Sequence, residues 1–264
     1  MADPLAPRSD SFGSGSSSQT GGAPATVAAG NGLTWWTEGW RLFAASPWLW
    51  IGIVVVFVVI SVALASIPFL GGLATTVLSP VLAAGIMAGC EAQDRGGQLT
   101  FAHLFSGFSD RLMPLVVVGL LYLAGTVAIA LVFGALLIGV VGVSGLSALM
   151  SNDPLQGGWA MLATLGLGAV IAVLVATLAA LPLMMACWFA PALVMLRHDE
   201  PVAAMKTSFF ACLANVMPML VYGLIGIVLS IVATIPFFLG WLVLGPVFAA
   251  SVYASYKDIF GARA

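Results

Sequence analysis

The sequence predicts an all-α integral membrane bundle of six transmembrane helices in three repeated hairpins, each preceded by a short amphipathic interfacial helix. Composition is the first indication, since 61% of the 264 residues are hydrophobic and 7% are charged, against about 25% charged in a soluble domain. Length is the second, because crossing about 30 Å of hydrocarbon takes roughly 20 apolar residues. The long apolar stretches cover residues 48–66, 73–90, 113–150, 159–196 and 216–255. The sequence lacks the short alternating segments of a membrane barrel.

A repeated sequence pattern is the third indication. An Ile-Pro-Phe turn occurs at residues 67–69 and again at 235–237, and an apolar segment with a central proline follows each. Two small residues stand at the fourth and fifth positions after that proline: Ala84-Gly85 after Pro80, Ala250-Ser251 after Pro246 and, more loosely, Ala186-Cys187 after Pro182. Residues 113–120 also match residues 217–224 in register. The pattern predicts three related modules.

Two parts are expected along the chain. Residues 1–31 are rich in Gly, Ser, Ala and Pro and contain no apolar block, which predicts a disordered cytoplasmic tail. The first residues include Asp3 and Pro4 in place of a basic segment followed by an apolar run, so no signal peptide is expected. Residues 32–261 are expected to form the membrane domain, with modules over about 34–95, 99–197 and 200–258.

Each module is expected to begin with a short amphipathic helix. In the first of these, Trp36, Trp40 and Phe43 share one face at helical spacing. A helix so rich in Trp suits the headgroup layer, where an indole ring buries its body and keeps its N–H in water. Further helices of this kind are expected over residues 100–112 and 200–216.

The middle module is longer than the other two. Each of its halves, residues 113–150 and 159–196, exceeds the length of one span, and only residues 151–158 between them have turn chemistry. Two long, tilted or protruding helices are expected, because a hairpin near Gly134 or Ala180 would lack polar turn residues. The sequence therefore predicts six spans, with eight as the alternative.

The distribution of basic residues predicts the topology. All eight lie in the tail, in the loops between modules or at the C-terminus: Arg8, Arg41, Arg95, Arg111, Arg197, Lys206, Lys257 and Arg263. Because basic residues accumulate in the cytoplasm, both termini are expected there, in a multi-pass protein of the bacterial inner membrane. Asp153 is then outside for six spans and inside for eight.

Prolines and small residues are the candidate functional positions. Pro80, Pro182 and Pro246 are expected to kink their helices and to free the carbonyls of Thr76, Leu178 and Leu242. Small-residue faces that let helices approach closely are predicted at two pairs of positions: Gly85 with Gly89, and Ser251 with Ser255. These features either shape a tight bundle or line a shared groove with exposed carbonyls.

Little else in the sequence suggests chemistry. No Asp, Glu, Lys, Arg or His lies within a predicted span, which argues against a proton-driven pump or a carrier of charged substrates. Cys90, Cys187 and Cys212 have no metal-ligand spacing, and His103 and His198 lie in loops without a motif such as HExxH. We therefore expect no enzyme activity, cofactor, metal or nucleic-acid partner, and membrane lipids as the main contacts. A protein partner or self-association is left open.

Several segments resemble an uncharacterised family of proteobacterial multi-pass inner-membrane proteins. They are residues 39–43, 78–85, 94–96, 188–193 and 245–260, and the resemblance covers about residues 32–261. It implies a membrane location and no assigned activity, so no functional residues follow from it.

The sequence leads to two hypotheses for function. The first is a non-enzymatic scaffold or accessory subunit that acts through helix and lipid contacts, because intramembrane charge is absent while packing surfaces are well developed. The alternative is a carrier or pathway for a lipid or other uncharged amphiphile. A filled axis would oppose the carrier, and a cavity bordered by Thr76, Leu178 and Leu242 would oppose a pure scaffold.

Overall fold

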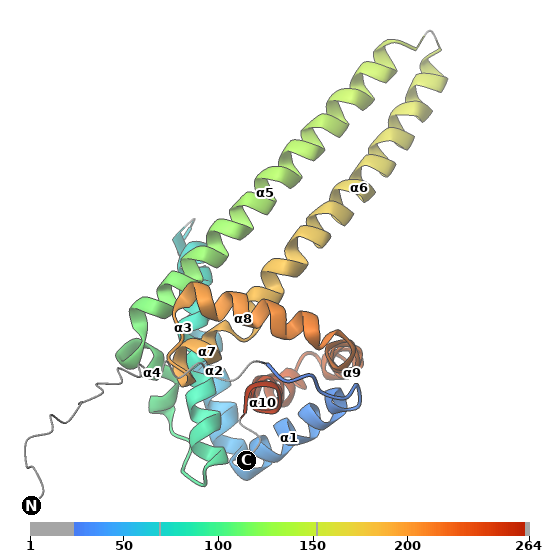
Figure 1. Ribbon diagram of the computed structural model, residues 1–264. Coiled ribbons are helices and arrows are strands. Elements are labelled where there is room, and N and C mark those ends of the chain that lie inside the picture. Colours follow the sequence, from blue (N-terminus) through green and yellow to red (C-terminus); the bar gives the residue numbers. More distant parts are fainter. Residues whose placement is uncertain (1–23, 69, 152, 262–264) are drawn as a thin grey trace, which may run out of the picture.

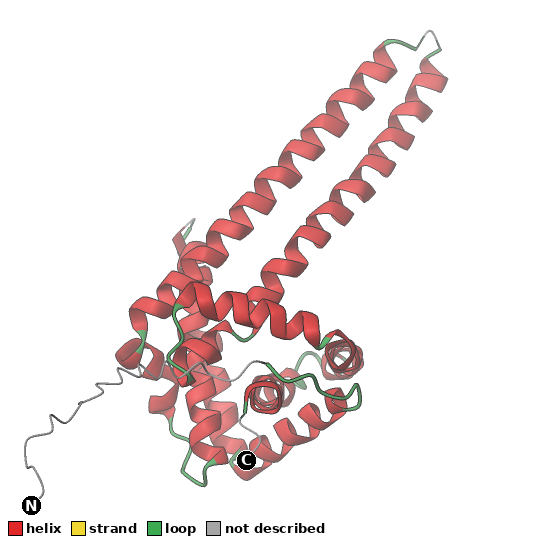
Figure 2. Cartoon of the chain, in the orientation of Figure 1, coloured by secondary structure: helices red, strands yellow, loops and turns green. Residues whose placement is uncertain are grey.

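The computed structural model describes residues 24–68, 70–151 and 153–261, and this part of the chain is helical with short connections (Figure 2). The helices are α1 Asn31–Ala45, α2 Pro47–Ala65, α3 Leu70–Asp94, α4 Phe101–Asp110, α5 Leu112–Leu149, α6 Pro154–Trp188, α7 Ala190–Leu196, α8 Pro201–Ala214, α9 Val216–Thr234 and α10 Trp241–Phe260. A short helix precedes each of the long pairs α2–α3, α5–α6 and α9–α10.

Among the described residues, five helical segments are long and apolar enough to cross a membrane: Pro47–Ala65, Leu70–Asp94, Leu112–Leu146, Leu155–Leu196 and Val216–Thr234. The sixth predicted span, α10, is not among them. Its last turn carries Lys257 and Asp258, and half of its residues are buried against other helices. A helix enclosed by protein needs a less apolar surface than one that faces lipid.

The middle pair forms two continuous helices, as expected from the missing turn chemistry near Gly134 and Ala180. α5 has 38 residues and α6 has 35, which correspond to about 57 Å and 52 Å. Figure 1 shows them side by side, projecting together well beyond the other helices. The same view looks nearly along the axes of α9 and α10. The axes of α5 and α6 are therefore steeply inclined to those of α9 and α10, and the long helices do not form one parallel bundle.

Each of the short helices α1, α4 and α8 packs mainly against a helix other than the long one that follows it. α4 packs against α3, α8 packs against α6 and α7, and α1 packs against α10, near the other end of the chain. Glycines allow two of these approaches, because a methyl group at Gly107 would collide with the carbonyl of Val81, and one at Gly39 with the carbonyl of Val247. Val81 follows Pro80 and Val247 follows Pro246, so equivalent positions of α3 and α10 receive a short helix.

The first helix is buried in the protein more deeply than the sequence suggests. Trp35, Trp36 and Phe43 are at most 5% exposed, whereas Trp40 is 54% exposed. The predicted headgroup-facing surface of Trp36, Trp40 and Phe43 is therefore wrong for two of its three members. α1 packs on α9 and α10, and Trp36 lies against Tyr222 and Phe248 of those helices. In α4, by contrast, Phe101, Phe105 and Phe108 stay exposed: they are at least 37% accessible.

Residues 24–31 contact the helices, whereas residues 1–23, which make up most of the predicted disordered tail, lie outside the described part. The N–H of Ala25 donates to the carbonyl of Ile259 at 2.9 Å. The buried side chain of Asn215 accepts from the N–H of Val27 at 2.9 Å and donates to the carbonyl of Ala25 at 3.0 Å. A buried amide with these bonds fixes the segment before α1.

Candidate functional site

The predicted kink positions do not share one environment. Pro80 lies inside α3 and Pro246 inside α10, and both are buried. Pro182 lies inside α6 but is exposed, whereas Pro191, in the first turn of α7, is buried. Pro191 thus has the setting that the sequence pattern assigned to Pro182. The freed carbonyl of Thr76 accepts a hydrogen bond from the hydroxyl of Ser79 at 3.1 Å, so it is not an open groove acceptor.

A small cavity of about 360 Å³ lies where these proline-containing helices meet. Pro80 and Pro191 line it, together with Tyr122 from α5 and Phe248 from α10. Trp188, the last residue of α6, stands in its wall. These side chains therefore leave a hollow between the helices that carry them.

A larger cavity of about 730 Å³ adjoins it and shares Met184, Trp188 and Phe248 in its wall. Helices α1, α6, α8, α9 and α10 contribute to the lining, which contains no charged residue. The volume falls within the range of about 300 to 1,000 Å³ that small-molecule sites occupy. Leu181 and Leu244 line it, but the predicted border residues Thr76, Leu178 and Leu242 do not. We call it the aromatic cavity.

Four aromatic rings from four helices frame this cavity. Trp36 of α1 stacks on Tyr222 of α9, with ring centroids 4.9 Å apart. Trp188 meets Tyr222 and Phe248 edge-on, at 6.3 and 6.2 Å. Such contacts are worth about 0.5 to 1.5 kcal/mol each beyond area burial, so the four rings stabilise this part of the wall.

The polar atoms of the aromatic side chains in the cavity wall are bonded, with one exception. The hydroxyl of Tyr222 lies 2.7 Å from Oγ of Ser251, and Nε1 of Trp36 donates to the carbonyl of Tyr222 at 3.1 Å. Nε1 of Trp241 donates to Oγ1 of Thr234 at 3.2 Å. Nε1 of Trp188 is buried and has no acceptor within the described structure. A buried donor without a partner costs about 1 to 3 kcal/mol and therefore requires an explanation.

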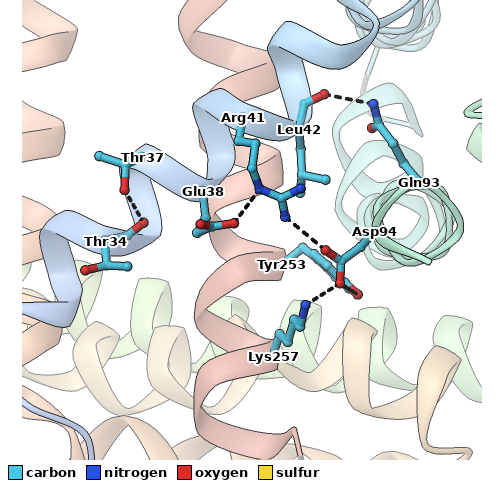
Figure 3. A network of polar contacts seen from close by, with 9 residues as sticks. All are labelled: Thr34, Thr37, Glu38, Arg41, Leu42, Gln93, Asp94, Tyr253 and Lys257. Carbon is cyan, nitrogen blue, oxygen red and sulfur yellow. Dashed lines mark hydrogen bonds and ion pairs between the residues drawn. The ribbon is translucent and has the colours of Figure 1, made fainter. Parts of the chain in front are cut away.

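A charged cluster lies apart from the aromatic cavity, where α1, α3 and α10 meet (Figure 3). Asp94 accepts from Nη2 of Arg41 at 3.0 Å, from Nζ of Lys257 at 2.5 Å and from the hydroxyl of Tyr253 at 3.3 Å. Glu38 also binds Arg41, at 2.7 Å. The pKa of Arg41 is raised because Glu38 and then Asp94 accept hydrogen bonds from its charged form.

The same junction continues into uncharged hydrogen bonds. Nε2 of Gln93 donates to the carbonyl of Leu42 at 2.9 Å, and Asp258 accepts from Asn31 and from Nε1 of Trp35, at 2.8 and 2.9 Å. A polar cavity of about 440 Å³ adjoins these residues. The cluster joins α1 and α3 to α10, and its bonds already pair the charges of Arg41 and Lys257.

The predicted packing positions lie at helix contacts. A side chain at Gly85 would collide with the backbone of His103 and Leu104, and one at Gly89 with Leu99, so both glycines face the segment around α4. Ser251 and Ser255 are buried, and each hydroxyl donates to a carbonyl three residues earlier at 2.7 Å. The structure does not bring these seven predicted positions into one site.

Residues that sequence reasoning missed include Trp188, Pro191, Asp94 and Asn215. Pro191 had a signal, since Pro-Ala-Leu at 191–193 matches Pro-Val-Leu at 80–82. No local sequence signal marked Asp94, because its partners Arg41 and Lys257 lie 53 and 163 positions away. Within the described ranges, no group of three or more His, Cys, Asp or Glu side chains is placed to hold a metal ion.

The long apolar helices and their element order define a multi-pass α-helical membrane protein. The chain is similar to a probable inner membrane protein of Burkholderia thailandensis, with 28% identity over 220 residues, which is 78% of this chain and 75% of the relative. This similarity confirms the resemblance to uncharacterised inner-membrane proteins and supports a location in the bacterial inner membrane. No family model matches the chain, and no solved structure matches it.

Proposed function

We propose that this protein binds an uncharged lipid in the aromatic cavity and acts in the inner membrane as a non-enzymatic carrier or holder of that lipid. The observation behind the proposal is the cavity itself: about 730 Å³, without a charged residue in its wall. Its walls include α6 and α9, both long enough to cross a membrane. The surrounding bilayer supplies apolar chains at high concentration, so a ligand of this class has direct access.

The uncharged wall also favours the lipid class. An ionised headgroup placed in apolar surroundings without a partner is costly, whereas a chain or neutral group is not. The lining includes three methionines, Met184, Met185 and Met219. Their flexible thioether side chains adapt to irregular apolar shapes. The proposal therefore follows the carrier alternative and specifies its site.

The test is to fill the cavity. Gly223 lines it and has no neighbouring atom within 4 Å of an added Cβ, so Gly223→Leu should occupy the space without a backbone collision. Gly134→Leu is the matched control, since Gly134 is equally open but lies on α5 away from the cavity. Native mass spectrometry after gentle extraction should find a several-fold loss of bound lipid for Gly223→Leu alone. Equal lipid in both variants would contradict the proposal.

The projecting hairpin favours a scaffold as the second candidate function. α5 and α6 expose large apolar side chains such as Leu131, Ile138 and Leu162 along a length greater than about 30 Å of hydrocarbon. A protein partner could cover the part of the hairpin that extends beyond the hydrocarbon layer. The same native mass spectrum separates the candidates, because a reproducible protein partner supports the scaffold and a stoichiometric lipid supports the carrier.

We further propose that both termini face the cytoplasm. The basic residues Arg41 and Lys257, from the first and last modules, meet at one junction, as the topology expected from charge requires.

A further inference from the structure

We infer that the ligand of the aromatic cavity is an uncharged lipid with a carbonyl oxygen, and that the indole N–H of Trp188 recognises this oxygen. The inference rests on the proposed function and specifies the ligand class. Trp188 lines both the aromatic cavity and the smaller cavity at the prolines, so its ring stands where the two meet.

The hydrogen-bond inventory of the wall assigns this role to Trp188. The other two indoles of the wall, Trp36 and Trp241, already donate to Tyr222 and to Thr234. Trp188 Nε1 is a buried donor that the described protein atoms leave without an acceptor. An indole nitrogen is a donor only, so a ligand that pairs with it must offer an acceptor such as a carbonyl oxygen.

The missing partner is also uncharged. No Lys, Arg or His lines the cavity to neutralise a phosphate or carboxylate, and an unpaired anion there would be strongly disfavoured. A ketone, quinone or ester carbonyl supplies the acceptor without a charge. The apolar remainder of such a lipid fits the rest of the wall, where Leu181, Ile227 and Leu244 contribute side chains.

Access to the N–H requires a small movement, because its neighbours cover it. Met184 and Met185 lie within four residues of Trp188 in the same wall, and methionine changes rotamer readily. Binding is therefore expected to displace a side chain and to leave the helix backbone in place.

The experiment compares two probes that differ only in the acceptor, heptadecan-2-one and heptadecane, on the detergent-solubilised full chain. Trp188→Phe keeps an aromatic ring and removes the donor, and should weaken ketone binding roughly two- to tenfold more than it weakens alkane binding. Trp48→Phe is the control, because it removes an indole N–H from a side chain that is 85% exposed on α2 and does not line the cavity.

A second readout reports the hydrogen bond directly. In ¹⁵N-labelled protein, the indole resonance absent from Trp188→Phe should move downfield with the ketone and stay in place with the alkane. Equal weakening of both probes by Trp188→Phe would overturn the donor role while the lipid site stands. Failure of both probes to bind the unaltered protein would overturn the lipid site itself.

Discussion

At the scale of single residues, Asp94 is the carboxylate on which the first and last modules converge. Its side chain is 10% exposed, whereas Arg41 and Lys257 are each 57% exposed. Asp94→Asn removes the charge that three donors share, and we expect a loss of about 1 to 2 kcal/mol of stability, reduced by solvent screening of the cations. Thermal unfolding in detergent measures this loss of stability.

The control for this change is Glu91→Gln, one turn earlier on α3. Glu91 pairs at 2.7 Å with Arg95, which is 76% exposed, and such a surface pair contributes about 0 to 1 kcal/mol. If Asp94→Asn is no more destabilising than Glu91→Gln, the cluster does not hold the modules together. High salt should narrow the difference between the two variants.

At the scale of helices, the glycines of α3 decide how closely α4 approaches. Gly85→Leu places a side chain against the backbone of His103 and Leu104, which cannot move aside as a flexible side chain does. Overpacking of this kind costs about 1 to 3 kcal/mol, so the variant should unfold at lower temperature and lose its monodisperse peak in size-exclusion chromatography.

Gly72→Leu on the same helix is the matched variant, because nothing lies within 4 Å of an added Cβ there. It should retain the stability of the unaltered protein. Unchanged stability of Gly85→Leu as well would mean that the α3–α4 contact is loose.

Helices were predictable from sequence where a local signal decided them. The absence of turn residues near Gly134 correctly predicts one continuous α5. The small residues after Pro80 and Pro246 mark close helix contacts, but spacing alone did not separate Pro182 from Pro191, because the buried setting of Pro191 depends on the tertiary fold. Similarly, an amphipathic pattern gives α1 an apolar face without saying whether lipid or α10 covers it.

At the scale of the whole molecule, the membrane topology can be tested at the tip of the α5–α6 hairpin. In a background with Cys90, Cys187 and Cys212 replaced by alanine, Asp153→Cys should react only with an impermeant maleimide added from the periplasmic side. The reason is the proposed topology, in which the basic residues at the other end of the hairpin lie in the cytoplasm. Mass shift on a gel measures the labelling.

Ser109→Cys, in the exposed last turn of α4, is the opposite marker and should react only after the inner membrane is opened. Labelling of Asp153→Cys from the cytoplasm would contradict this topology. The class of fold was predictable because lipid imposes a strong compositional constraint. The aromatic cavity and the Asp94 cluster were not, because both depend on contacts between modules far apart in the chain.

The packing of α1 on α10 also sets an order of events during synthesis. α1 leaves the ribosome first, and its partner begins at Trp241, about 200 residues later. At a synthesis rate of about 5 to 20 residues per second, Trp35 and Trp36 of α1 remain without their final neighbour, α10, for about 10 to 40 seconds. Tryptophan side chains are stable at the membrane–water interface, so we expect α1 to lie there during this interval. A nascent chain stopped before Trp241 would therefore display at the membrane surface the same residues that the finished protein buries.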